Sequence, residues 1–200
     1  MKILITGGFG FLGSRLAEHF MNQNHDVTLA SRSYRKLAGN LSEVNFFKVD
    51  WGDQKNLDKM VDKQDVVIHA AGINARNCLD NHPYASSNLA AEKFINKFDS
   101  FNNMRTIIFR LANNFGYPAF SNKDCWSLVI NDLCLQAIAN REMVINGSGE
   151  DLRDFMPIDM VCKIFDDFIL GKITSLNHST YNICSSNSLS IMDVAKKIQS

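Results

Sequence analysis

The sequence lacks the features that would place it in several broad classes. It has no long apolar run, since the opening segment Met1 to Thr6 is too short for a signal peptide or a membrane-spanning helix. It has no excess of one charge, because 21 basic residues balance 21 acidic ones. A basic surface of the kind that binds nucleic acid or an acidic membrane is therefore not expected. We predict neither a nucleic-acid partner nor a membrane partner.

The cysteines lack any recognisable pattern. The five are scattered, with no C-x-x-C pair: Cys78, Cys125, Cys134, Cys162 and Cys184. A metal or redox site is one interpretation, and small buried hydrophobic residues are the other, which we adopt. We therefore expect no metal site. The odd count and the lack of a secretion signal favour a reducing cytoplasm.

What the chain does have is an alternation of strand and helix patterns in its first half. Its 200 residues suffice for one α/β domain with a sizeable core. The alternation is typical of βαβ units and a parallel sheet. The run Val66-Val67-Ile68 is typical of a strand buried on both faces. We expect strands over 2–6, 26–31, 45–49, 65–70 and 105–111, and helices over 11–23, 56–61 and 85–101.

The pattern changes after residue 112. The segment 113–118, Asn-Asn-Phe-Gly-Tyr-Pro, indicates a loop. We expect helices over 125–140, 158–170 and 190–198, and short strands over 143–145 and 181–183. The chain ends within its last helical pattern, which is an unusual place for a domain to end.

A glycine-rich turn joins the first expected strand to the first expected helix. It reads Thr6-Gly7-Gly8-Phe9-Gly10-Phe11-Leu12-Gly13, and a dinucleotide-binding turn requires this strand-to-helix context. Gly7, Gly10 and Gly13 allow a tight turn and a close approach of backbone to a pyrophosphate. The N–H groups where the helix begins, around Phe11 and Leu12, would hold the phosphates. The alternative is a turn with a purely structural role.

The end of the second expected strand bears on the choice of cofactor. An acidic residue there would accept hydrogen bonds from the adenine ribose hydroxyls. This chain instead has Ser31 followed by Arg32, and a guanidinium suits a 2′-phosphate. We therefore favour NADP(H) as the cofactor, with NAD(H) as the other candidate. The alternative is that Arg32 is a solvated loop cation.

Further segments carry a family resemblance: Val49 to Asp53, Ile68 to Gly72, Arg110 to Gly116, and Gly147 to Phe155 followed by Asp159. Together they resemble the NAD(P)-dependent nucleotide-sugar epimerases and dehydratases of the extended short-chain dehydrogenase/reductase family. The resemblance covers nearly the whole chain. It implies an α/β fold, a Rossmann-like doubly wound parallel sheet with a small incomplete C-terminal substrate lobe. The dinucleotide-binding domain would be 1–112, and 113–200 would be the partial lobe, interleaved with it.

The resemblance also implies an activity and roles for particular residues. The activity is hydride transfer between a nicotinamide and a nucleotide-activated sugar, and a homodimer is one assembly it allows. Asp50 and Trp51 would lie near the adenine, and Ala70 and Ala71 would lie along the cofactor. The substrate candidates are Asn113 and Arg153, since a bidentate cation suits a diphosphate.

Each of these residues also has a structural interpretation. Asp50 could end a strand, Asn113 could be an ordinary loop residue, and Arg153 could pair with Asp154 or Asp159. For His69, at the end of an apolar strand, we favour a hydrogen-bonded structural role without catalysis.

The catalytic stretch is incomplete. Pro83 to Glu92 is similar to the family's Y-x-x-S-K-x-x-A-E, which places Tyr84 on the acid/base tyrosine and Asn88 on the lysine. In the family that lysine lowers the phenol pKa from about 10 and binds the nicotinamide ribose. Asn88 can hydrogen-bond a ribose but carries no charge. Lys93 lies nine residues after Tyr84, which places it on a different helix face.

The spacing before Tyr84 is also short. Only Ile73 to Pro83 separates it from the Ile68 to Gly72 segment, too little for the family's intervening helix and its strand bearing a serine or threonine. We therefore expect one α/β repeat to be absent and the strands at 65–70 and 105–111 to become neighbours. Three hypotheses follow: an active enzyme, a catalytically impaired dinucleotide-binding homologue, and a truncated fragment without activity.

Overall fold

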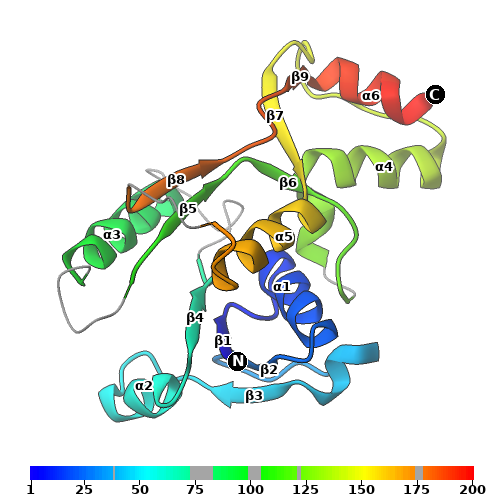
Figure 1. Ribbon diagram of the computed structural model, residues 1–200. Helices are drawn as coiled ribbons and strands as arrows, with labels where there is room; N and C mark the ends of the chain where they lie inside the picture. Colours follow the sequence, from blue (N-terminus) through cyan, green and yellow to red (C-terminus); the bar gives the residue numbers. More distant parts are fainter. Residues whose placement is uncertain (38, 73–82, 99–104, 121–122, 174–177) are drawn as a thin grey trace.

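The N-terminal half of the chain forms a parallel four-stranded sheet (Figure 1). The structure, a computed structural model, describes residues 1–37, 39–72, 83–98, 105–120, 123–173 and 178–200. The sheet has the order β3-β2-β1-β4. Its strands are β1 (Lys2–Thr6), β2 (Asp26–Ser31), β3 (Asn45–Lys48) and β4 (Val66–His69). Helices α1 (Phe11–Asn22) and α2 (Gln54–Val61) and the 3₁₀ turn η1 (Gly39–Glu43) connect them, so the predicted βαβ alternation is confirmed.

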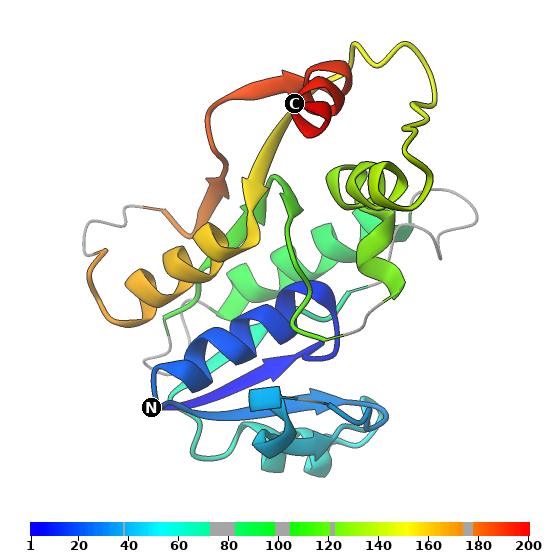
Figure 2. The same cartoon turned by 90° about the vertical axis from the view of Figure 1, so that its right-hand side faces the viewer.

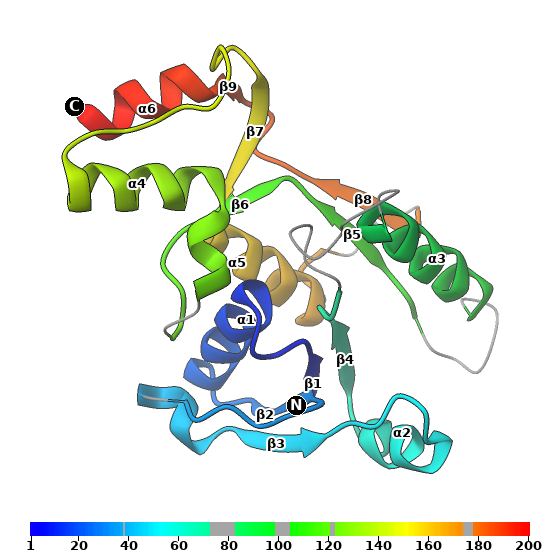
Figure 3. The ribbon, with the colours of Figure 1, turned by 180° about the vertical axis from the view of Figure 1, so that it is seen from behind.

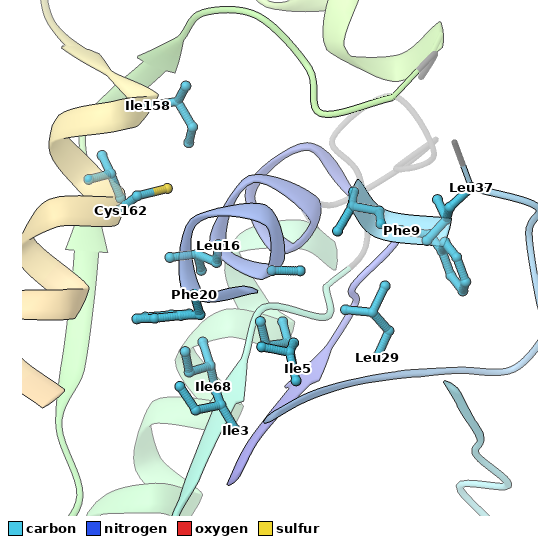
Figure 4. Close-up of a cluster of buried hydrophobic side chains, with 14 of the residues drawn as sticks. Ile3, Ile5, Phe9, Leu16, Phe20, Leu29, Leu37, Ile68, Ile158 and Cys162 are labelled. Carbon is cyan, nitrogen blue, oxygen red and sulfur yellow. The ribbon is translucent and has the colours of Figure 1, made fainter. Parts of the chain in front are cut away.

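The two faces of this sheet pack against different helices because strand side chains alternate between faces. Ile3 and Ile5 join Leu16 and Phe20 of α1 in the main core, in which all four are fully buried (Figure 4). On the opposite face, Leu4 packs with Met60 of α2. Helix α5 (Ile158–Ile169) covers α1 from outside through Ile158, Val161 and Cys162, so a late segment completes the N-terminal core.

The second half of the chain forms two smaller sheets. Strand β5 (Ile108–Leu111) pairs with β8 (Thr180–Ile183) in parallel. Strand β7 (Leu152–Pro157) pairs with β6 (Asn113–Phe115) in parallel and with β9 (Ser188–Ser190) in antiparallel fashion. The remaining elements are α3 (Pro83–Phe98), the 3₁₀ turn η3 (Lys123–Ser127), α4 (Val129–Asn140) and α6 (Ile191–Gln199). Helices α4 and α6 lie together at the end of the molecule away from the N-terminus (Figure 2).

Side-chain caps fix where two of the helices begin. The Asp53 carboxylate accepts a hydrogen bond from the Lys55 N–H at 2.9 Å, so α2 begins at Gln54, two residues before the expected start. The Ser190 hydroxyl accepts from the Asp193 N–H at 3.0 Å and starts α6. The helices predicted at 11–23, 158–170 and 190–198 are confirmed to within one residue at each end.

Three predictions for the second half are wrong. The expected loop at 113–118 begins with β6, because Asn113 to Phe115 pair with β7. No strand forms at 143–145, and the helix expected over 125–140 is divided at Leu128 into η3 and α4. Strands β7 and β9 were not predicted. These short strands form through pairing between distant segments, which local sequence patterns do not encode.

The expectation that strands β4 and β5 become neighbours is also wrong. β4 is an end strand of the four-stranded sheet, and β5 pairs with β8 in a separate sheet (Figure 3). Among the described residues no strand pairs with the edge of β4 opposite β1. Val67, expected to be buried, is 48% exposed, whereas Ile68 on the α1 face is buried. β4 is therefore covered on one face and partly open on the other.

The cysteine prediction is confirmed for Cys125 and Cys162, which are buried, and wrong for Cys184, which is exposed. Burial raises the pKa of the Cys162 thiol to about 12, so it stays protonated and unreactive at neutral pH. Cys78 lies outside the described residues. In the described part of the chain, no helix is long and apolar enough to span a bilayer, and no cluster of histidine, cysteine or acidic side chains is arranged to hold a metal.

Candidate functional site

The carboxyl ends of the four parallel strands bring most of the predicted cofactor residues to one edge of the sheet. Thr6 pairs with Ala30 on one side and with His69 on the other, and Ser31 pairs with Lys48. The residues that follow these strand ends therefore emerge together. Ligands bind at this edge in open α/β sheets. The predicted residues found there are Gly7, Ser31, Arg32, Asp50, Trp51, Ala70 and Ala71.

The glycine turn is held in a conformation that larger residues cannot adopt. Gly7 has a φ of +68°, and a Cβ on it would lie 2.7 Å from the Ala70 carbonyl and from the Ala71 Cα. A Cβ on Gly13 would lie 2.4 Å from the Gly7 carbonyl oxygen. The Gly10 N–H donates to the Gly7 carbonyl at 2.8 Å and closes the turn. These glycines let β1, the start of α1 and the segment after β4 approach closely.

The start of α1 has the properties of an anion-binding site. Gly10 is its N-cap and provides no side-chain acceptor, and no acidic residue lies in the first turn. The first N–H groups of a helix have no intrahelical acceptor, so those of Phe11, Leu12 and Gly13 are available to a ligand. The positive end of the helix dipole adds to the attraction for negative charge.

Arg32 and Asp50 emerge from adjacent strands. Arg32 is exposed and forms no ion pair with any described residue. Asp50 is partly engaged within its own turn, since its carboxylate accepts the Gly52 N–H at 3.0 Å. The Asp50 N–H donates to the Asn56 side chain at 2.9 Å. Trp51 is 47% exposed at the same edge, where its ring contacts His69 edge-on.

His69 has the hydrogen-bonded role that we favoured. Its Nδ1 lies 2.8 Å from the Thr6 hydroxyl, which ties the ends of β4 and β1 together. Partial removal from water lowers the pKa of the imidazole from 6.5, so the ring is neutral at pH 7. The Ala70 N–H donates to the Thr6 carbonyl at 3.2 Å and holds the segment that borders the glycine turn.

Helix α3 carries the two residues of the incomplete catalytic stretch. Tyr84 lies in its first turn, but the Tyr84 side chain falls outside the described part of the chain. Asn88 is half-buried, and its Oδ1 would lie 3.9 Å from a Cβ on Gly72, so it borders the segment after β4. Arg110 of β5 donates two hydrogen bonds to the Glu92 carboxylate, at 2.9 and 2.6 Å, and joins β5 to α3. This ion pair lowers the pKa of Glu92.

The two predicted substrate residues line one pocket. Asn113 on β6 and Arg153 on β7 border a cavity of about 190 Å³. The Asn113 side chain donates to the Asp154 carbonyl at 3.0 Å, which leaves its own oxygen as an acceptor. The other residues of the lining come from β6, β7 and the start of α4: Asn114, Ser127, Leu128, Val129, Ile130 and Phe155.

The structural alternatives for Arg153 do not hold in this structure. The Asp154 carboxylate instead accepts the Ser185 N–H at 2.8 Å and the Ser185 hydroxyl at 2.9 Å. The hydrogen bond from the Ser185 backbone is the main cause that lowers the pKa of Asp154. Asp159 pairs with Arg15 of α1. Arg153 has only a loose contact with Asp151, at 3.8 Å, and is 44% exposed.

Two features of this pocket were not predicted from the sequence. The start of α4 forms one wall, and its N-cap, Leu128, provides no side-chain hydrogen bond. The Asn114 Oδ1 is buried beside it and has no partner among the described residues. The buried Asn131 positions the wall, since its side chain bonds both the N–H and the carbonyl of Gly116 at 3.0 Å. An asparagine within an expected helix was the one available signal, and it is not specific.

Comparisons with known proteins agree with this geometry. The curated relatives include a putative UDP-glucose 4-epimerase from Methanocaldococcus jannaschii, 38% identical over 89 residues, which are 41% of this chain and 28% of that protein. A dTDP-D-glucose 4,6-dehydratase from Dictyostelium discoideum is 24% identical over 274 residues and covers 98% of this chain and 61% of its own length. The chain thus spans less than two thirds of the length of these curated relatives.

A solved structure supports the fold independently. The dTDP-glucose 4,6-dehydratase of Bacillus anthracis in complex with NAD matches 99% of this chain and 80% of its own with a TM-score of 0.77, at 18% identity. The family model described as "NAD dependent epimerase/dehydratase family" matches residues 3–80 and 73–184. Since these matches extend over most of the chain and agree with its glycine turn and parallel sheet, the chain belongs to the NAD-dependent epimerase/dehydratase family.

Proposed function

We propose that the protein binds a nicotinamide dinucleotide at the β1–α1 turn and acts as an oxidoreductase on a nucleotide-activated sugar. The main observation that supports this proposal is the close approach of Gly7 to the Ala70–Ala71 backbone, beside the start of α1, which has no side-chain cap. Gly7, Gly10 and Gly13, with the N–H groups of Phe11 and Leu12, would hold the pyrophosphate. The nicotinamide, when bound, supplies a reversible hydride acceptor.

The residues after β2 and β3 support a preference for NADP(H) over NAD(H). No acid ends β2, and the exposed Arg32 has no competing carboxylate among the described residues. A guanidinium can bind a 2′-phosphate with two parallel hydrogen bonds. Ser31 and Asp50 lie beside it, at the ends of paired strands. Asn88 on α3 would bind the nicotinamide ribose.

The cofactor preference can be tested by titrating the protein with NADPH and NADH. We expect the unmodified protein to bind NADPH more tightly, and Arg32→Asp to reverse the preference by repelling the 2′-phosphate. Arg141→Asp, which makes the same charge change at the C-cap of α4, should leave the preference unchanged. Equal preference in the unmodified protein and Arg32→Asp would remove the argument for NADP(H).

The pocket between β6, β7 and α4 is the proposed site for the diphosphate of the nucleotide sugar. Arg153 provides a guanidinium for the diphosphate, and in the same cavity Asn113 provides an amide oxygen that can accept a hydrogen bond from a sugar hydroxyl. Arg153→Gln should weaken binding of UDP-glucose or dTDP-glucose roughly tenfold to a hundredfold, since hydrogen bonds to charged groups contribute about 1.5–3 kcal/mol. Asp151→Asn, the matched control, removes the loose partner of Arg153 and should not weaken binding. Unchanged affinity in Arg153→Gln would exclude this site.

A second candidate function is dinucleotide binding without turnover. Asn88, at the position of the family's lysine, favours it, because an amide cannot stabilise a phenolate at Tyr84 by charge. Asn88→Lys separates the two functions when NAD(P)H formation from nucleotide sugars is followed. A gain in turnover would indicate that the rest of the centre is assembled, whereas no gain with normal cofactor affinity would support the binding function.

A further inference from the structure

Strand β4 has one edge without a pairing strand in the described part of the chain. The Ala70 N–H donates to the Thr6 carbonyl at 3.2 Å, and the register aligns Ile5 with Ile68, so Val66 and Ile68 direct their backbone groups toward β1. Alternate residues of a parallel strand face opposite neighbours. The backbone groups of Val67 and His69 therefore face away from β1, toward the open edge.

In the residues that the structure describes, strand β5 also has an edge without a pairing strand. The Ile108 N–H donates to the Ser179 carbonyl at 2.8 Å, and the Ala112 N–H to the Ile183 carbonyl at 2.9 Å. By the same alternation, Phe109 and Leu111 direct their backbone groups away from β8. Unpaired strand edges are templates for an additional strand.

Apolar side chains of β4 and α3 are exposed. Val67 on β4 is 48% exposed, and Leu89 and Phe94 on α3 are 49% and 62% exposed. A strand of a doubly wound sheet normally has helices on both faces. The sheet at this place thus lacks both a strand and a covering helix.

The comparisons indicate that part of the relatives' sequence has no counterpart in this chain. The alignment with the D. discoideum dehydratase runs over 274 residues, although this chain has only 200, so part of the relative has no counterpart here. The two matches of the family model, 3–80 and 73–184, meet between β4 and α3. The ten residues from 73 to 82 are too few for a strand and a helix with their turns.

We propose that a strand with an attached helix, supplied by a separate polypeptide, inserts between β4 and β5. The strand would hydrogen-bond to Val67 and His69 on one side and to Phe109 and Leu111 on the other. Its helix would cover Val67. The partner is thus an extended apolar segment rich in β-branched residues, joined to an amphipathic helix.

Amide hydrogen exchange tests this proposal. The probe is a synthetic peptide from the part of the D. discoideum dehydratase that has no counterpart in this chain. We expect it to slow exchange at Val67, His69, Phe109 and Leu111 by roughly tenfold or more. The Ile68 amide, already paired with β1, is the internal control and should change little. A peptide of scrambled sequence should have no effect.

Matched variants locate the contact. Val67→Lys places a charge where the added helix would pack and should weaken peptide binding. Val61→Lys makes the same change at a similarly exposed valine on α2 and should not. Failure of the peptide to protect Val67 and His69 would overturn the proposal. Protection seen only in a chimera with the segment inserted at 73–82 would overturn it as well.

Self-association is the other outcome that would overturn the proposal. Protection of the same amides that grows with protein concentration, with a dimer mass by light scattering, would assign the edge to a second copy of this chain. Cofactor titration of the same samples tests the proposed function independently of the strand insertion. Loss of NADPH binding would count against that function, and a change in amide exchange bears only on the strand edge.

Discussion

The two halves of the molecule differ in how completely their sheets are paired and covered. The sheet β3-β2-β1-β4 is continuous, and its central strand β1 is buried between α1 and α2. The second half divides its strands between two small sheets, and β5 contacts α3 through an exposed ion pair. The half that resembles a cofactor site is therefore well packed. The half that should complete the catalytic centre has open strand edges.

Under the proposed function, cofactor binding and catalysis would depend on separate parts of the fold. The glycine turn relies on β1, α1 and the segment after β4, all of which are present. The family resemblance implies that catalysis also requires the tyrosine, lysine and serine or threonine to be assembled on α3 and on a strand beside it. Asn88 stands at the position that the resemblance gives to the lysine, and no strand pairs with the edge of β4 opposite β1 in the described structure.

The largest expected effect comes from truncating the core of each half in turn. Phe20→Ala in the first core should reduce the free energy of unfolding by about 3–5 kcal/mol and abolish cofactor binding with it. Leu133→Ala, between α4 and α6, should cost about 2–5 kcal/mol while cofactor affinity persists at moderate temperature. Denaturant titrations, with cofactor binding measured in parallel, check this. Equal loss of binding in both variants would mean that the halves unfold as one unit.

The next effect concerns the close approach in the glycine turn. Gly7 and Gly39 have nearly the same backbone φ, +68° and +63°, but a Cβ on Gly39 would meet nothing within 4 Å. In both alanine variants the left-handed backbone conformation costs about 1 kcal/mol. Only Gly7→Ala adds a collision with the Ala70–Ala71 backbone, so it should weaken dinucleotide binding by more than roughly tenfold. Similar affinities in the two variants would show that the close approach is not needed.

The smallest expected effect is a pH dependence of thermal stability that arises in the second half of the chain. Hydrogen bonds from Ser185 lower the pKa of Asp154 below its ordinary 3.8. A lowered carboxyl pKa adds stability above the ordinary pKa, and this stability is lost as pH falls through the lower value of the folded state. Thermal unfolding of the unmodified protein should therefore lose stability below about pH 4 more steeply than that of Asp154→Asn. Asp151→Asn, which changes an exposed carboxylate, should keep the steep loss, and parallel curves for all three would contradict the role of Asp154.

Local sequence patterns were sufficient for the first half and less so for the second. Strands β1 to β4 contain apolar runs, and the glycines of the turn are needed for steric reasons that hold in any context. Strands β6, β7 and β9 include the polar residues Asn113, Asp154 and Ser188, and form only because distant segments pair. The same applies to the pocket, where Asn113 and Arg153 lie 40 positions apart in the chain and meet through the β6–β7 register.

The sequence by itself determined the family and the glycine turn between β1 and α1, and it predicts that Asn88 stands at the position of the family's lysine, because each depends on residue type at a fixed local spacing. Only the tertiary structure decided that β4 and β5 do not pair, that Val67 is exposed, and that Asp154 and Asp159 have partners other than Arg153. Those outcomes depend on which distant segments compete for the same strand edges and charges. Nearest-neighbour patterns along the chain carry no information about that competition.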